Sequence, residues 1–135
     1  MSPQALTAPI VVRRQDAQSG NARNNPAITT AAYFSNFAAG HLVGTSIASH
    51  PAGEECGSHN HRGAVEQFMV IGGRGIIEVD GVRHEVGVED CVVVPVGATH
   101  NLIGVSRDEP FRVVCTFVMA PGHEDDTTPW KATSA

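Results

Sequence analysis

Short apolar runs separated by turn-forming residues recur along the chain from His41 onward. The runs are rich in Val, Ile and Phe, and they alternate with Gly, Pro, Asp and Asn. This spacing is typical of all-β sandwiches and barrels. The predicted strands are Leu42–Ser49, Val65–Ile71, Gly75–Val79, Val82–Val86, Cys91–Val94, His100–Val105 and Phe111–Met119. We therefore expect an all-β fold.

Two local patterns refine this strand prediction. Asp80-Gly81 lies between two predicted strands and suits a two-residue type I′ hairpin, in which both central residues take a positive φ. Cys91–Val94 and Val113–Val118 are apolar on both faces, which predicts burial on both sides. One face would lie inside the barrel, and the other would lie beneath a covering strand, arm or subunit.

The two ends of the chain are less periodic than its middle. Ile10–Arg13 predicts a short N-terminal strand, whereas Asp16–Thr30 is polar and Asn-rich and predicts a loop. The end of the chain is rich in Pro, Asp and Thr and predicts an irregular tail, in which Trp130 anchors the tail or lies at an interface. The expected organisation is an N-terminal arm and loop (1–39), a barrel (40–119) and a C-terminal tail (120–135).

The composition describes one compact domain. A chain of 135 residues with 41% hydrophobic side chains can bury roughly 68% of the surface that it exposes when unfolded. Such a domain needs neither a disulfide nor a metal to hold its fold, so a metal found in it would be functional. The formal net charge is -5 and the nine Lys and Arg residues are scattered, which argues against a nucleic-acid partner.

Cysteine usage and the length of the apolar runs indicate a soluble cytoplasmic protein. The three cysteines have irregular spacing and no CxxC, so neither a disulfide framework nor a thiolate zinc site is indicated. The first residues lack a basic segment followed by a long apolar core. The densest apolar run, Cys91–Val96, is too short to cross a membrane.

Three histidines and one glutamate have the spacing of a metal site. His59 and His61 are two residues apart, and in an extended chain such residues point to the same side. Glu66 follows on a strand face shared with Phe68, where a charged carboxylate costs several kcal/mol unless it is paired or bound to a metal. His100 follows a turn that contains Pro and Gly and is the fourth candidate. This mixed nitrogen and oxygen set suits one divalent transition-metal ion, namely Mn, Fe, Co, Ni, Cu or Zn.

The same residues resemble the two sequence motifs of the cupin superfamily. The fixed positions of the first motif are occupied by Gly53, His59, His61, Glu66 and Gly73, and the core of the second by Pro95, Gly97 and His100. Two positions depart from the second motif, since Glu89 stands where a glycine is usual and Gly104 where an asparagine is usual. The resemblance covers about Gly40 to Met119. It implies a jelly-roll-like double-stranded β-helix barrel, usually dimeric, with the metal held by His59, His61, Glu66 and His100.

A few residues outside the ligand set are candidates for a substrate pocket. His50 precedes the metal loop and is the best placed of the remaining histidines for contact with a ligand residue or a substrate. Phe68, Val70 and Phe117 are equally compatible with a pocket wall and with plain core, because small-molecule sites are mostly apolar. Cys56 lies within the first motif, where a small buried hydrophobic residue is the simpler interpretation.

The expected metal site has open coordination positions. Three imidazoles and one carboxylate leave room on a five- or six-coordinate ion for water or substrate, which is a catalytic arrangement. We therefore expect a metal-dependent enzyme that acts on a small oxygen-rich organic molecule with dioxygenase- or isomerase-like chemistry. Glu66 would be its base if it dissociates from the ion or swings, by analogy with dioxygenases of the family. Two alternatives stay open: a non-catalytic module that binds or senses a sugar or organic acid, and a metal-free interaction barrel.

Overall fold

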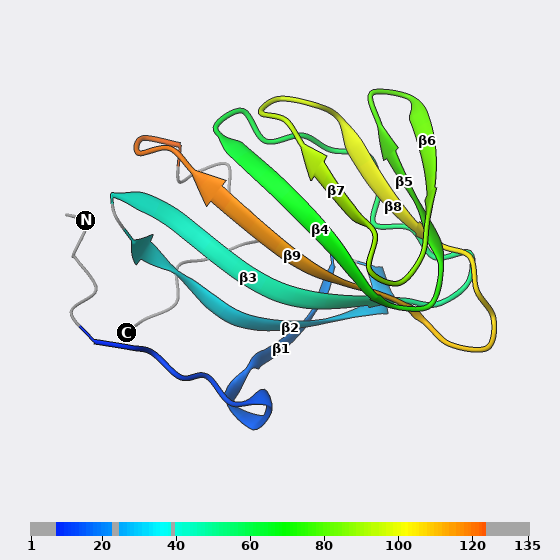
Figure 1. The fold of residues 1–135 in the computed structure, drawn as a ribbon, viewed down its shortest axis with the longest axis horizontal. Coiled ribbons are helices and arrows are strands. Elements are labelled where there is room, and N and C mark those ends of the chain that lie inside the picture. Colours follow the sequence, from blue (N-terminus) through cyan, green and yellow to red (C-terminus); the bar gives the residue numbers. More distant parts are fainter. Residues whose placement is uncertain (1–7, 23–24, 39, 124–135) are drawn as a thin grey trace.

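The computed structural model describes residues 8–22, 25–38 and 40–123, which form an all-β fold, as predicted (Figure 1). The elements are the 3-10 helix η1 (Arg14–Asp16) and the strands β1 (Gln18–Ala22), β2 (Asn25–Ala38), β3 (His41–His50), β4 (Ala64–Gly72), β5 (Gly75–Val79), β6 (Val82–Val86), β7 (Cys91–Val94), β8 (His100–Gly104) and β9 (Phe111–Met119). They build two antiparallel sheets, with the orders β1-β2-β3-β9-β4-β7 and β6-β5-β8. No helix within these residues has the length and apolarity of a membrane span. The predicted tail beyond residue 123, with Trp130, lies outside the described residues.

The strand bounds predicted from the apolar runs are close to those of the structure. Strands β5, β6, β7 and β9 begin and end at the predicted residues, and the ends of β3, β4 and β8 differ by no more than one residue. Between β5 and β6, Asp80 has a φ of 47° and Gly81 a φ of 81°, as the predicted hairpin requires. Asp80 Oδ1 accepts a hydrogen bond of 2.9 Å from the Thr99 N–H, so this hairpin also holds the start of β8 at His100.

The strand predictions for the N-terminal segment are wrong. Ile10–Arg13 forms no strand, and the segment predicted as a loop, Asp16–Thr30, contains β1 and the first part of β2. The pattern misleads because β1 is an edge strand whose side chains are largely exposed, so neither of its faces needs apolar residues. The turn that follows is stabilised by a side chain, since Asn21 Nδ2 donates to the carbonyl oxygens of Pro26 and Ile28 over 3.1 and 3.2 Å.

The core lies between the two sheets, and the large sheet turns one face toward it. Along β4, buried and exposed residues alternate strictly, and β9 follows a similar pattern. Residues of β4 and β9 pack in one cluster with residues of β5 and β8. In the single chain the outer faces of Cys91–Val94 and Val113–Val118 are open, since Val93 is 57% and Val118 42% exposed, so the cover predicted for these faces is not supplied by the described strands or arm. Both residues lie on the outer face of the large sheet, away from the core.

The two departures from the second motif have opposite structural consequences. Gly104 ends β8 so close to the end of β3 that a Cβ there would collide with the carbonyl oxygens of His50 and Pro51. This position therefore requires glycine. Glu89, in the turn between β6 and β7, has a φ of 75°, in the left-handed region that favours glycine. The backbone at Glu89 therefore favours the glycine that is usual in the motif over the glutamate that this chain has.

Replacing Glu89 with glycine is expected to stabilise the protein. The substitution relieves left-handed strain of about 1–2 kcal/mol, and the greater freedom of glycine in the unfolded chain opposes it by about 0.5–1 kcal/mol. The free energy of unfolding in urea should rise by about 0.5–1 kcal/mol. The matched control is Glu85→Gly, at an exposed position of β6, which should lose about 0.5–1 kcal/mol. An equal loss at both positions would contradict the prediction.

Candidate metal centre

Backbone hydrogen bonds hold the loop that carries two of the predicted ligands. His59 and His61 lie on the loop between β3 and β4, Glu66 lies on β4, and His100 is the first residue of β8. His59 and His100 exchange two backbone hydrogen bonds, of 3.0 and 2.8 Å. The Gly97 N–H donates to the His61 carbonyl oxygen over 2.9 Å. The loop is thereby fixed against β8 and the turn that precedes it.

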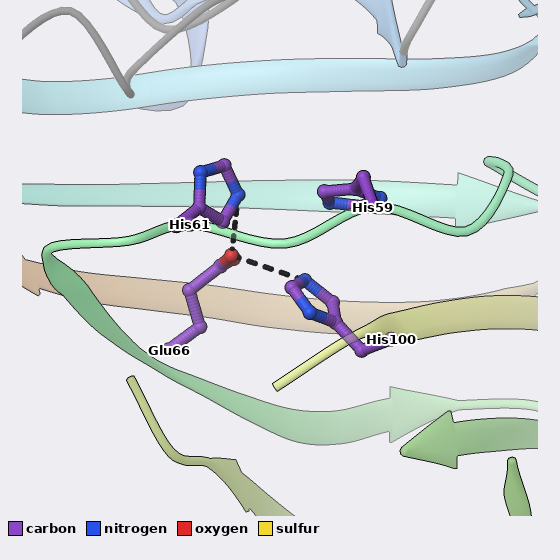
Figure 2. A group of neighbouring side chains, drawn as sticks. All are labelled: His59, His61, Glu66 and His100. Carbon is purple, nitrogen blue, oxygen red and sulfur yellow. Dashed lines mark ion pairs between the residues drawn. The ribbon is translucent and has the colours of Figure 1, made fainter. Parts of the chain in front are cut away.

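The structure brings the four predicted ligands together, with their side chains pointing toward one another (Figure 2). One donor atom from each of them lies within 4.8 Å of the other three. Glu66 Oε1 is 2.8 Å from His61 Nε2 and 3.1 Å from His100 Nε2. The ring centroids of His59 and His100 are 4.2 Å apart. His59 is half-buried and the other three are buried, so the cluster is most open at His59.

The imidazole rings direct lone pairs toward the centre of this cluster. His59 Nδ1 lies 2.8 Å from the Gly57 carbonyl oxygen, and His100 Nδ1 lies 3.1 Å from the Ala98 carbonyl oxygen. A carbonyl oxygen only accepts, so in each neutral ring Nδ1 carries the proton and Nε2 presents its lone pair. Glu66 Oε1 and His100 Nε2 are close in distance, yet neither makes a hydrogen bond of acceptable geometry among the described residues. Buried acceptor atoms that converge in this way fit a bound cation.

Glu66 is held in the ionised form that a metal ligand needs. Burial raises the pKa of its carboxyl group, but hydrogen bonds and positive charge from the His100 and His61 rings in their protonated form lower it more, so the pKa lies well below its usual value. The second carboxylate oxygen has a different neighbour, because Cys115 Sγ lies 3.2 Å from Glu66 Oε2. Burial and the nearby Glu66 charge hold the pKa of the Cys115 thiol well above its usual value. The glutamate is therefore a carboxylate and the cysteine a thiol.

A cavity of about 240 Å³ opens beside the cluster. Its wall includes His59, His61 and Glu66, so three of the four ligands border it. Strand β1 contributes all five of its residues, and β2 and β3 contribute hydroxyl groups from Thr30, Ser35 and Ser46. A concave site with a few hydrogen-bonding groups among apolar ones suits a small organic molecule.

Of the predicted pocket residues, His50 and Phe68 line this cavity, and Val70 and Phe117 are not among its lining residues. Val70 is fully buried in the core between the sheets. The Phe117 ring lies so close to the Gly44 backbone that a Cβ on this glycine would collide with it. Val70 and Phe117 thus pack in the interior, away from the cavity wall.

Two parts of the site were missed by sequence reasoning. Strand β1 has no apolar alternation that would have revealed it. Cys115 lies on the buried face of β9, opposite Phe68 and two residues before Phe117, which pairs with Glu66. The alternation along Phe111–Met119 was the signal that would have placed its side chain inside the barrel.

His50 is a neutral imidazole in the cavity wall. Its side chain is almost completely buried, and its Nδ1 has no hydrogen-bond partner among the described residues. Burial lowers the pKa of His50 from 6.5 to about 4, and a hydrogen bond with the Phe111 backbone offsets part of that shift. At neutral pH the ring is therefore uncharged and has one nitrogen without a partner in the described part of the chain.

Two sequence comparisons bear on the family of this chain. A sequence model of the family described as a cupin domain matches residues 46–117, more than half of the chain. One curated relative, the uncharacterized protein MJ1618 of Methanocaldococcus jannaschii, is 25% identical over 75 residues. That match covers 56% of this chain and 59% of the relative, so it spans less than two thirds of the relative's length.

Solved structures share this fold at low sequence identity. A predicted oxalate decarboxylase from Thermotoga maritima has a TM-score of 0.66 and 14% identity, and the match covers 82% of this chain and 99% of that one. A mutant of salicylate 1,2-dioxygenase from Pseudoaminobacter salicylatoxidans, in complex with gentisate, has a TM-score of 0.60 and 21% identity. That match covers 74% of this chain and 27% of the dioxygenase. At such identities the likeness establishes the fold.

Proposed function

The chain belongs to the cupin family, and from this premise we propose that it is a metal-dependent enzyme acting on a small oxygen-rich organic molecule. The observation that carries the proposal is that one cavity borders on the ligand cluster, with His59, His61 and Glu66 belonging to both. A closed structural metal site would have no such opening. A bound divalent transition-metal ion would supply Lewis-acid or redox chemistry at the end of this cavity.

The residues of the chain have distinct parts in this proposal. His59, His61, Glu66 and His100 would hold the ion, and the carboxylate of Glu66 would serve as a base toward a substrate proton only after it dissociates from the ion or swings away from it. His50 and Phe68 contact the substrate from the cavity wall, one as a neutral hydrogen-bonding group and the other as an apolar surface. Dioxygenase-like chemistry is supported by the fold shared with a dioxygenase that was solved with gentisate, itself a small oxygen-rich molecule.

A second candidate is a module that binds or senses a sugar or organic acid without converting it. It is favoured by the uncharged hydrogen-bonding side chains that lie among the apolar residues of the cavity wall. The side chains of Gln18, Asn21, Thr30, Ser35 and Ser46 provide hydrogen bonds for hydroxyl groups, and none of them is an acid or base at neutral pH. In such a module the metal would anchor the ligand.

Turnover by the metal-loaded protein distinguishes the two candidates. Protein loaded separately with Fe, Mn, Co, Ni, Cu or Zn would be incubated with enediols, catechols, diketones and sugar acids, while oxygen consumption and product formation are followed. We expect at least one class to be converted, and the activity to disappear after treatment with a chelator. Metal-replete protein that binds members of the panel and leaves all of them unchanged would favour the binding module.

We propose further that the protein works as a cytoplasmic homodimer. Val65 and Val118 pair across β4 and β9 on the outer face of the large sheet, and Met69, Ile71 and Val93 lie on the same face. These side chains are 37–57% exposed and form an apolar surface that a second copy would cover. None of the three cysteines is in a disulfide, in keeping with a reducing compartment. Sedimentation equilibrium showing the mass of a single chain would contradict the dimer.

A further inference from the structure

We propose that Cys115 is a positioning residue for the metal site, whose thiol holds the Glu66 carboxylate so that a single oxygen faces the histidines. The inference rests on the proposed metal site, but not on any particular reaction. The observation behind it is that the two carboxylate oxygens of Glu66 have different neighbours. Oε1 lies 2.8 and 3.1 Å from the imidazoles of His61 and His100, and Oε2 lies 3.2 Å from Cys115 Sγ.

The register of the large sheet explains why the thiol reaches that oxygen. On the inner face of the sheet, Phe68 of β4 stands opposite Cys115 of β9, and Glu66 stands opposite Phe117. Cys115 and Glu66 are therefore diagonal neighbours on adjacent strands, within reach of side-chain contact. Both side chains are at most 5% exposed, so little bulk water reaches their contact.

The direction of this hydrogen bond follows from the two groups. An ionised carboxylate only accepts, so the thiol is the donor, and its single proton serves a single oxygen. Rotation of the carboxylate about its last bond would take Oε2 away from this donor. Cys115 therefore favours the orientation in which Oε1 alone is offered to an ion held by the histidines.

A bound ion would then be held by a single oxygen of Glu66. A carboxylate that binds through both oxygens occupies two positions on the ion, whereas one held by Cys115 occupies one and leaves the other open. The thiol also borders the cavity, as does Glu66. Cys115 thus helps to keep a coordination position open toward the cavity, without itself being a ligand.

Substitutions of Cys115 that change the hydrogen-bond donor and the side-chain volume independently test this inference. Cys115→Ser keeps a donor, whereas Cys115→Ala and Cys115→Val remove it, one with a smaller and one with a larger side chain. Val113→Ala is the matched control, because Val113 is fully buried on the same face of β9 and also lines the cavity. The readouts are the Kd for Co²⁺ and the visible absorption spectrum of the Co²⁺ protein, which reports coordination number.

We expect the two donor-free variants to bind Co²⁺ about tenfold more weakly, at the lower end of the range for outer hydrogen-bond partners of ligands. Both should have an altered spectrum. Cys115→Ser should keep the parent spectrum and most of the affinity, and Val113→Ala should lose stability without a change in Kd. Parent-like binding by either donor-free variant, or an equal loss in Cys115→Ser, would overturn the inference.

The same experiment separates this inference from the proposed function. If the parent protein binds no Co²⁺, both proposals fail. If it binds the ion and the variants behave as expected, while no substrate is converted by the metal-loaded parent, the positioning role of Cys115 stands and the proposed enzymatic function fails.

Discussion

Purified without a chelator, the double variant His59→Ala, His61→Ala should contain almost no metal, whereas the parent contains about one ion per chain. The variant retains only Glu66 and His100 of the four ligands. If about 12 kcal/mol of binding free energy is shared among four ligands, losing two of them weakens binding at least a thousandfold. Elemental analysis gives the metal content, and competition with a chelating dye gives the affinity.

The control for this variant is the double substitution His41→Ala, His84→Ala. Both histidines are exposed and lie outside the ligand cluster. This control also removes two imidazoles, so it reveals any unspecific binding by surface histidines. Equal metal content in the two double variants would contradict the metal site. Circular dichroism of both variants would verify that each is folded.

The second large effect concerns acid stability, which we expect His50→Gln to improve. A histidine with a pKa of about 4 in the folded protein and 6.5 when unfolded binds its proton preferentially in the unfolded chain. Its contribution to stability is therefore complete above pH 6.5 and is lost as the pH falls toward 4. The size of that loss is on the order of 3 kcal/mol. Glutamine does not titrate, so the variant should lose correspondingly less stability between pH 6.5 and 4.

The measurement is the difference in free energy of unfolding between His50→Gln and the parent, followed from pH 7.5 to 4 with a chelator present throughout. Taking the difference cancels the contributions of every other titrating group that the substitution leaves unchanged. The comparison variant is His84→Gln, an exposed histidine of β6 that carries no burial cost. If the difference in free energy of unfolding between His50→Gln and the parent did not change with pH, burial would not be lowering the pKa of His50.

Most of the barrel could be predicted from the sequence, because its strands turn one face to the core. Where burial alternates, as along Ala64–Gly72 and Phe111–Met119, apolar periodicity marks both the strand and its inner face. At the two edges of the large sheet this reasoning was less successful, because β1 was not predicted and β7 was predicted without the exposure of its outer face. Gln18–Ala22 is polar because it is exposed, and Cys91–Val94 is apolar although largely exposed. Strand order depends on pairings between distant segments, which periodicity does not encode.

The candidate ligands were predictable for a different reason. The relation of His59 to His61 is local, since two residues separated by one in extended chain face the same way. The contact of Cys115 with Glu66 is not local, because it depends on which strands pair and in what register. The cavity escaped sequence reasoning for the same reason. Its wall is assembled from β1, β2, β3, β4, β8, β9 and the loop before β4, whose arrangement in the two sheets cannot be read from any one segment.

Strand β1 supplies five residues to the cavity wall and none to the ligand cluster. As an edge strand it is paired on one side only, with β2, and its side chains are largely exposed. Changes in its sequence would alter the molecules that the cavity accepts and leave the four ligands in place. In evolutionary terms, the cavity wall of this protein can change through one polar edge strand while the four candidate ligands are kept.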